Sequence, residues 1–386
     1  MKKIFVIALI LMLGFSCSKK TEIENQIQPN QENFVSMDMV VDIAYNIKFP
    51  NMKNGSSLKS ANKKTKEVKK IDEVKNKNEV TAFYVVNYNE GGFLLISSDL
   101  RTSPIIGFSE KGSFDMDEAN MPDGLRFWIK DAKKQFFEIQ KSDIKPSAKE
   151  KIAWKLVKES LITDVSSLKS IPIPGCYEHT EVVTKGPLST SSAWGQKDGF
   201  YNSLPYNTCE GIEEHAYAGC GPIAMGQIMD YYEYPNSWNW TNIPTDLTTT
   251  SSFIANIWYN INDKYQGYPH YVCGATGIFP YMIAPVLNDK FGFTSASFAD
   301  YNYQTVKSNL WYNKPVILSG GGHAWFCDGY KTVGYYWDDC TGTEYLYFYM
   351  KWGSYGIYDG WFCYNKFNPG IFNFSEDEKM VYNIYP

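Results

Sequence analysis

The alternation of apolar and polar positions divides the chain into two folded units. In the first, residues 34–47 show the apolar spacing of a short amphipathic helix. Residues 82–88 and 93–96 alternate as strands around a turn rich in Asn and Gly, which predicts a β-hairpin. A third strand is expected at 105–108 and an aromatic helix at 125–139. The first unit is therefore predicted to be a small α+β domain.

Polar stretches interrupt this pattern twice. Residues 53–79 contain nine Lys against four acidic residues, which predicts a solvated loop, with attraction to a membrane surface as the alternative. Residues 141–186 are rich in Lys, Ser and Pro and predict an extended connection. We place the boundary between 17–185, a tether followed by the first domain, and 186–386, which is rich in Trp, Tyr and Gly.

The amino terminus predicts export. Lys2 and Lys3 precede an apolar run at 4–15 that is too short to span a bilayer, and small residues lead into Cys17. This pattern is typical of a bacterial lipoprotein signal over residues 1–16, with Cys17 as the lipidated residue. A signal peptide that merely contains a cysteine is the alternative. We expect a lipoprotein of the cell envelope, sorted to the outer membrane, with a second domain that is released after processing.

Composition narrows the possible partners. The net charge is −5, and no basic stripe of the kind that binds a phosphate backbone is present, which argues against nucleic acid. Removing Cys17 and one catalytic thiol from the eight cysteines leaves six, which allow 15 pairings. No paired CxxC spacing occurs. We expect no structural metal and no cofactor.

Cys220 has the local sequence of a nucleophile. Gly219 and Gly221 flank it, Pro222 suits the first turn of a helix, and an apolar helical face follows over 223–232. The N-terminus of a helix favours thiolate over thiol. The alternative is a buried structural cysteine.

A nucleophilic cysteine needs a base, and the chain contains four histidines. His179 falls in the connecting segment, His215 in a charged loop, and His270 after a Tyr-Pro turn. His323 follows Ser-Gly-Gly-Gly and opens an apolar strand, so it is the preferred candidate.

Two further residues complete the candidate site. Gln196 lies 24 positions before Cys220 and is a candidate side-chain donor to an oxyanion. Trp352 ends a strand predicted over 345–350, where an aromatic ring would shield the histidine from water.

Three motifs in this order resemble the streptopain family of papain-like cysteine peptidases. They are WGQKDGFYNSLP from Trp194, AGCGPIAMGQIMDYYEYP from Ala218 and GGHAWFCDGY from Gly321. The segment YVVNYNEGGFLLISSD from Tyr84 is similar to the family's inhibitory propeptide. The resemblance implies an α+β, papain-like catalytic domain of 186–386 made as a zymogen. It also implies that Cys220 is the nucleophile, His323 the base, Gln196 the oxyanion donor and Trp352 the neighbour of the histidine.

The sequence departs from the family near Trp352. Family members read Asn-Trp-Gly-Trp-Gly-Gly, whereas this chain has Lys351 and Ser354 in place of the Asn and the second Trp. The expected partners are protein or peptide substrates and the chain's own propeptide, on a monomer held to the membrane by its lipid. Two other functions stay open. One is a transglutaminase-like or amidase reaction, and the other is a catalytically impaired surface protein that binds host protein or glycan.

Overall fold

The computed structural model describes residues 31–47, 66–119, 121–160, 179–191, 194–336, 342–364 and 377–386. The predicted signal, Cys17 and most of the tether lie outside these residues. Among the described residues, eleven strands form one sheet, in the order β1-β2-β3-β4-β14-β13-β12-β11-β15-β10, with β5 also paired to β12. Every pairing in this sheet is antiparallel.

The strands of the large sheet have the following bounds: β1 (Val68–Lys75), β2 (Thr81–Tyr88), β3 (Phe93–Ser97), β4 (Ile105–Ser109), β5 (His179–Lys185), β10 (Ser297–Asp300), β11 (Val316–Gly320), β12 (His323–Tyr336), β13 (Gly342–Lys351), β14 (Gly360–Phe362) and β15 (Lys379–Tyr382). Two separate hairpins are formed by β6 (Tyr206–Cys209) with β7 (Ile212–His215), and by β8 (His270–Val272) with β9 (Ala275–Gly277).

The helices are α1 (Met37–Asn46), α2 (Asp123–Lys141), α3 (Ala148–Ser160), α4 (Cys220–Tyr232), α5 (Leu247–Lys264), α6 (Ile283–Phe291) and α7 (Tyr303–Trp311). Short 3-10 turns occur at η1 (Gln31–Asn33), η3 (Trp240–Asn242) and η4 (Pro280–Met282). None of the described helices is both long enough and apolar enough to cross a membrane.

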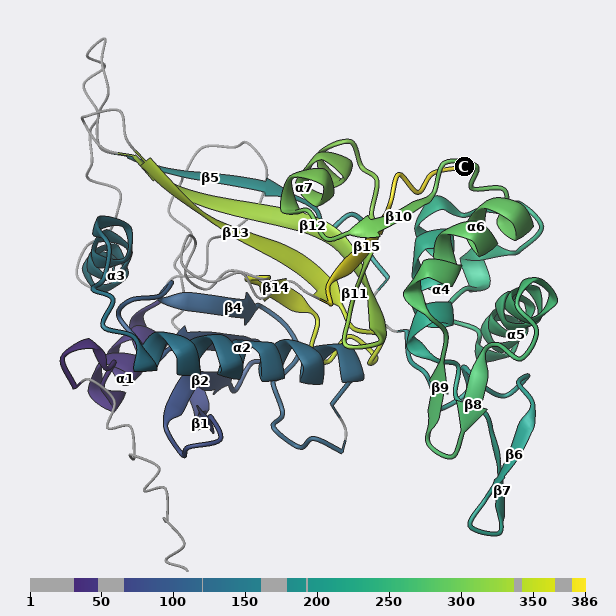
Figure 1. The fold of residues 1–386 in the computed structure, drawn as a ribbon, viewed down its shortest axis with the longest axis horizontal. Helices are drawn as coiled ribbons and strands as arrows, with labels where there is room; N and C mark the ends of the chain where they lie inside the picture. Colours follow the sequence, from purple (N-terminus) through teal and green to yellow (C-terminus); the bar gives the residue numbers. More distant parts are fainter. Residues whose placement is uncertain are drawn as a thin grey trace, which may run out of the picture.

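The first unit forms as its pattern predicts. The β2–β3 hairpin, β4 and the aromatic helix α2 are all present, and α2 extends along the sheet beneath β4 (Figure 1). Trp128 and Phe136 of α2 pack on Phe83 of β2, with ring centroids 6.1 and 6.3 Å apart. Burial of this apolar helix face against the sheet stabilises the unit.

Two loop predictions for the first unit are wrong in part. Residues 68–75, within the lysine-rich stretch, form β1 at the edge of the sheet. Only Val74 of this strand is fully buried, so its lysines keep their charges in water, as is common on edge strands. Residues 148–160 of the expected extended connection form α3, which buries Ala153 and Trp154.

The two units share the sheet. β4 of the first unit pairs with β14 of the second through Phe108–Trp361 and Gly107–Phe362. The indole N–H of Trp128 also donates to the carbonyl of Cys363 at 2.8 Å. In Figure 1 the sheet occupies the left and centre, and α4, α5, α6 and both small hairpins lie together on the right. The mixture of antiparallel sheet and packed helices confirms the α+β class.

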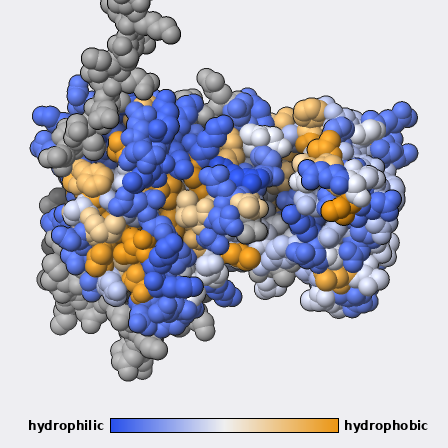
Figure 2. Space-filling view, turned by 90° about the horizontal axis from the view of Figure 1, so that it is seen from below, coloured by the Kyte–Doolittle hydropathy of each residue, from blue (hydrophilic) through white to orange (hydrophobic). Residues whose placement is uncertain are grey.

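The outer surface differs between these two parts. Seen from below, apolar side chains are exposed in several places on the left half of the molecule, and more sparsely among hydrophilic ones on the right half (Figure 2).

Candidate active site

Cys220 is the first residue of α4, as the sequence predicts, and its thiol is free. Gly219 precedes it with φ +86°, a conformation that side chains disfavour. A Cβ at Gly219 would lie 2.9 Å from the Thr276 side chain, and one at Gly221 would lie 2.5 Å from Ile278. Gly219 is therefore required by backbone conformation and close packing, and Gly221 by close packing.

His323 opens β12, also as predicted, directly after the turn from β11. The next residue in the strand, Ala324, donates its backbone N–H to Sγ of Cys220 at 3.4 Å. The start of the histidine strand and the start of the nucleophile helix are therefore in contact. No hydrogen bond joins Cys220 to His323 themselves in the described part of the chain.

The imidazole of His323 instead faces a carboxylate of the first unit. Its Nδ1 lies 3.5 Å from Oδ2 of Asp123, the first residue of α2. Asp123 also forms an ion pair with Arg126 one turn later. Asp123 thus holds the candidate base from outside the candidate catalytic domain.

The first turns of α2 are packed closely onto this region. A Cβ at Gly124 would lie 2.9 Å from the ring of Trp325, and one at Gly320 would lie 2.3 Å from the ring of Phe127. The rings of Phe127 and Trp325 are 6.4 Å apart. The N-terminal end of α2 therefore covers the residues on both sides of His323.

Burial shifts the pKa of each of the two candidate catalytic groups so that its neutral form is favoured. The pKa of the Cys220 thiol is raised mainly by desolvation, although the N–H groups of Ala324, Gly221 and Cys220 itself oppose the shift. The pKa of His323 is lowered by desolvation and then by the nearby charge of Arg126. The helix N-terminus acts on the thiol as expected, but in the full-length chain burial outweighs it. This arrangement favours a neutral thiol and a neutral imidazole.

Gln196 lies in a loop that is fixed to the nucleophile segment. Its carbonyl accepts the N–H of Ala218 at 3.0 Å, two residues before Cys220. Above this loop, the ring of Tyr355 covers Gly195, where a Cβ would be only 2.1 Å from it. The Tyr355 hydroxyl donates to Asp198 at 2.9 Å. The half-buried Gln196 is therefore held between Ala218 and the 353–356 turn.

Trp352 packs on two aromatic rings. Its ring is 5.2 Å from that of Trp325 and 5.3 Å from that of Phe362, and no ring contact joins it to His323 among the described residues. Its backbone N–H donates to Oδ1 of Asp359 at 3.2 Å. Trp352 therefore supports the strand that carries the histidine, through Trp325.

Lys351, which stands in place of the family's Asn, is buried in the interior. It is 2% exposed, and its Nζ donates to the carbonyls of Ser189 and Ser191 at 2.8 and 2.7 Å and lies 3.2 Å from Oδ2 of Asp328. Lys351 thus anchors the segment that leads to Trp194 and Gln196.

Sequence reasoning missed several residues of this region. Asp123 is an ordinary acidic residue at a helix start, and only the fold brings it to His323. The disulfide between Cys209 and Cys273 was one of many possible pairings, while Cys327 and Cys363 are buried free thiols. Cys17, Cys176 and Cys340 lie outside the described residues.

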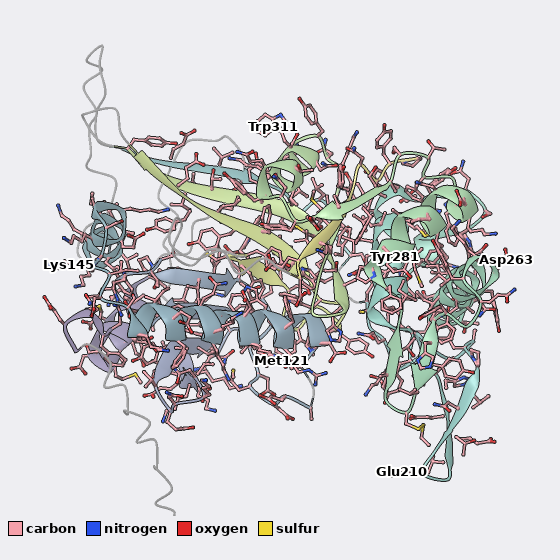
Figure 3. All side chains as sticks on the ribbon, in the orientation of Figure 1. Met121, Lys145, Glu210, Asp263, Tyr281 and Trp311 are labelled. Atoms are coloured by element: carbon pink, nitrogen blue, oxygen red, sulfur yellow. A yellow bond between two sulfur atoms is a disulfide. The ribbon has the colours of Figure 1, made fainter. Side chains whose placement is uncertain are left out.

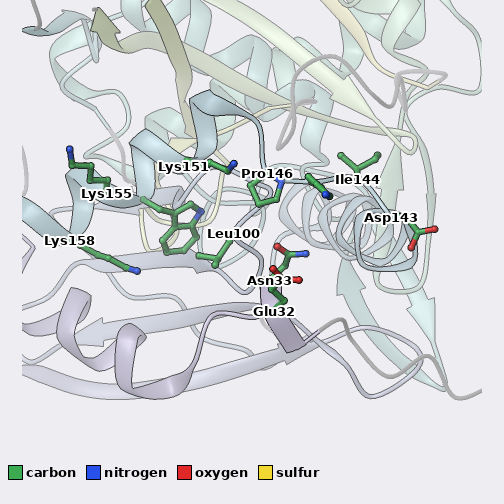
Figure 4. A pocket seen from close by; sticks show the side chains of 11 residues that line it. Glu32, Asn33, Leu100, Asp143, Ile144, Pro146, Lys151, Lys155 and Lys158 are labelled. Atoms are coloured by element: carbon green, nitrogen blue, oxygen red, sulfur yellow. The ribbon is translucent and has the colours of Figure 1, made fainter.

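A cavity of about 680 Å³ in the first unit is separate from this site (Figure 4). Its lining includes Trp154, Leu100 and four lysines, and none of the candidate catalytic residues. No group of three or more His, Cys, Asp or Glu side chains suited to a metal ion occurs within the described ranges.

Comparison with known proteins agrees with this arrangement. Residues 194–276 match the Peptidase C10 family, and residues 46–136 match the Spi protease inhibitor. The chain is 24% identical over 365 residues to streptopain of Streptococcus pyogenes, covering 82% of this chain and 83% of streptopain. It is also 24% identical over 367 residues to the thiol protease/hemagglutinin PrtT of Porphyromonas gingivalis, covering 80% of this chain but only 37% of PrtT.

The fold has a solved counterpart as well. Prointerpain A of Prevotella intermedia, a fragment with a Cys-to-Ala substitution, superposes with a TM-score of 0.56 at 20% identity, covering 82% of this chain and 99% of that structure. The fold and the site together define a papain-like cysteine peptidase with its inhibitor domain in place. Within that class the chain is similar to the streptopain type: the Peptidase C10 match over residues 194–276 and the Spi inhibitor match over residues 46–136 agree with the resemblance seen in its motifs.

Proposed function

We propose that the protein is an exported, lipid-anchored zymogen of a cysteine endopeptidase. The observation that carries the proposal is the junction at Cys220. The nucleophile helix meets the histidine strand there through the Ala324 N–H, while Asp123 of the inhibitor domain engages His323. The matches of residues 194–276 to a peptidase family and of residues 46–136 to a protease inhibitor support a peptidase made as an inhibited zymogen.

In the proposed mechanism, removal of α2 opens the site and frees His323 from Asp123. His323 then withdraws the proton from Cys220, and the thiolate attacks a peptide carbonyl. The backbone N–H of Cys220 and the side chain of Gln196 stabilise the oxyanion. The imidazolium protonates the departing amine, and water, deprotonated by His323, hydrolyses the thioester and regenerates the thiol.

The lipid belongs to the same proposal. Cys17 and the signal pattern support export and attachment to the outer membrane, and the lipid then lies on the propeptide side of the processing site. Mature enzyme leaves the membrane once the two fragments separate. A mature domain that stays membrane-bound after processing and a high-salt wash would contradict this step.

The decisive experiment compares residues 18–386 as wild type and as Cys220→Ala under reducing conditions. Wild type alone is expected to lose its first domain, as followed by mass, and then to hydrolyse casein. If both stay intact, an added protease removes the first domain. A processed form that ignores peptides and a thiol-directed probe would refute the peptidase. Transfer to an added amine in preference to water would instead indicate a transglutaminase.

A further inference from the structure

A strained tyrosine lies beside the loop that carries Gln196. Tyr355, in the turn after β13, has φ +56°, and Asp198 in the loop has φ +48°. Residues other than glycine seldom adopt this left-handed conformation, which persists only where the surrounding contacts hold it. The family's Asn-Trp-Gly-Trp-Gly-Gly motif has Gly at the position of Tyr355, and Gly adopts such a φ without strain. The contacts of the Tyr355 side chain therefore have to offset this strain.

Those contacts bracket Gln196 from both sides. Before it, the ring of Tyr355 covers Gly195 so closely that a Cβ there would lie 2.1 Å from the ring. After it, the hydroxyl of Tyr355 accepts the N–H of Lys197 at 3.3 Å and donates to Oδ2 of Asp198 at 2.9 Å. Tyr355 thus contacts the residues immediately before and immediately after the candidate oxyanion donor.

Burial in the core does not explain the presence of this tyrosine. Its backbone N–H donates to the carbonyl of Trp194 at 2.8 Å, and its ring meets that of Phe200 edge-on, with centroids 6.0 Å apart. The residue is nevertheless 37% exposed. It lines a cavity of about 450 Å³ together with Asp198, Phe200, Pro244, Thr245 and Leu247. The burial of apolar surface is therefore incomplete at Tyr355, and the bracketing contacts distinguish it.

The turn that carries Tyr355 is itself fixed to the nucleophile helix. Gly353 has φ +67°, and a Cβ there would lie 2.8 Å from the side chain of Ile223 in the first turn of α4. The loop returns to the start of the same helix, because the carbonyl of Gln196 accepts the N–H of Ala218 at 3.0 Å. Tyr355 therefore closes a ring of contacts that begins and ends at α4, entirely within the second unit.

We propose that Tyr355 is a positioning residue, which holds the loop of Gln196 so that the side-chain amide lies where the oxyanion forms. A displacement of about 1 Å can lower a rate by about 100-fold, so rigid placement of this loop affects kcat directly. Burial, and then the hydrogen bond to Asp198, raise the pKa of Tyr355, so its hydroxyl remains a donor at neutral pH. The inference rests on the proposed peptidase function, in which Gln196 stabilises the oxyanion.

Kinetics of the processed enzyme test the effect on the reaction. Each full-length chain is processed with an added serine protease, which is then inhibited, and active sites are counted with a thiol-directed epoxide. Tyr355→Gly relieves the backbone strain but should lower kcat by about 10- to 100-fold, while KM for a peptide changes by less than about twofold. Tyr355→Phe keeps the ring on Gly195 and loses the hydroxyl contacts, so kcat should fall by about 2- to 10-fold.

Coupling to Gln196 separates positioning from a general structural role. In a Gln196→Ala background, Tyr355→Gly should lower kcat by less than about twofold, because the donor that it positions is absent. The matched control is Asn313→Gly, at another position of positive φ, +59°, two residues after Trp311 at the end of α7 (Figure 3), and it should leave kcat unchanged. Equal losses from Tyr355→Gly in both backgrounds, or a loss in KM instead of kcat, overturn the proposal.

Hydrogen exchange tests the loop without catalysis. In the full-length Cys220→Ala chain, Tyr355→Gly should speed amide exchange in peptides that cover residues 195–200 by at least about tenfold, and Asn313→Gly should not. Exchange at the parent's rate overturns the proposal. Faster exchange with an unchanged kcat refutes the positioning role and leaves the peptidase standing. Faster exchange with a processed wild type that cleaves no peptide refutes the peptidase, and with it any role of Tyr355 in the reaction.

Discussion

The buried carboxyl of Asp359 allows a quantitative test of the packing just after β13, the strand that pairs with the histidine-bearing strand β12. The residue is 4% exposed, its Oδ1 accepts the N–H of Trp352, and its Oδ2 has no hydrogen-bond partner among the described residues. Burial raises the pKa of Asp359 to about 7, although the charge of Lys351 opposes the shift. Asp359→Asn keeps an oxygen acceptor for Trp352 and removes the ionisation.

Whether the ionisation of Asp359 raises or lowers folding stability depends on whether the folded or the unfolded chain binds its proton more tightly. The folded pKa lies above the value of about 3.9 for an exposed Asp, so the unfolded chain releases the proton at lower pH than the folded chain. Ionisation of Asp359 therefore removes stability as the pH rises from about 4 to about 7. Between about pH 5 and about pH 8, this linkage amounts to a loss of about 2.5 kcal/mol.

Urea unfolding of the Cys220→Ala chain, followed by tryptophan fluorescence, measures this loss without self-cleavage. The stability difference between Asp359→Asn and the parent should grow in favour of Asn by about 2.5 kcal/mol from about pH 5 to about pH 8. Asp289→Asn, at a carboxylate whose side chain is 57% exposed, controls for the loss of a surface charge. Curves for Asp359→Asn and the parent that stay parallel across this range would refute the assignment of a buried, protonated carboxyl.

Three further changes test other parts of the site. Asp123→Ala removes a 3.5 Å contact to His323 that, between partly exposed side chains, contributes about 0.2–1 kcal/mol, so conversion of the zymogen should accelerate by about 1.4- to 5-fold, and Asp143→Ala at an exposed position should leave the rate unchanged. Lys351→Met leaves Asp328 buried without its cation and should cost about 3–5 kcal/mol in urea unfolding, much of it recovered by adding Asp328→Asn; a cost that the second change does not reduce would contradict the ion pair. Gln196→Ala should lower kcat of the processed enzyme by about 100- to 1000-fold, and an unchanged kcat would exclude Gln196 as an oxyanion donor.

The residues with local signatures were predictable from the sequence. Gly219 and Pro222 mark the start of a helix at Cys220, and the glycines before His323 mark the start of a strand, because the reasons for both are contained within a few residues. The β2–β3 hairpin and α2 follow from apolar periodicity in the same way. These elements needed no knowledge of distant contacts.

The residues that escaped prediction depend on pairing across the chain. Asp123 meets His323 only because α2 packs on β11 and β12, some 200 positions later. The sequence shows only that Lys351 replaces the family's Asn. Its role in anchoring the segment at Ser189 and Ser191 depends on the fold, which brings the carbonyls of these residues to its ammonium group. The composition of the lysine-rich residues 68–75 predicts a loop, because a charged edge strand such as β1 has nearly the same composition as a loop.

The shared sheet bears on how the zymogen separates after it is cut. β5 pairs with β12 over His179–Lys185, so a cut before His179 leaves this strand on the catalytic domain, while a cut after Lys185 would leave it with the propeptide. Neither cut breaks the β4–β14 pairing or the hydrogen bond from Trp128 to Cys363.

Those contacts bury Trp361 and Phe362, whose exposure would open an apolar sheet edge. Cleavage of the backbone is thus a different event from loss of inhibition, because α2 remains on His323 until the β4–β14 edge opens. With the lipid attachment at Cys17 that we propose, the same contacts would also delay release of the second domain from the membrane. Since the non-covalent contacts outlast the cut, we expect digestion or displacement of the first domain to be the step that uncovers Cys220.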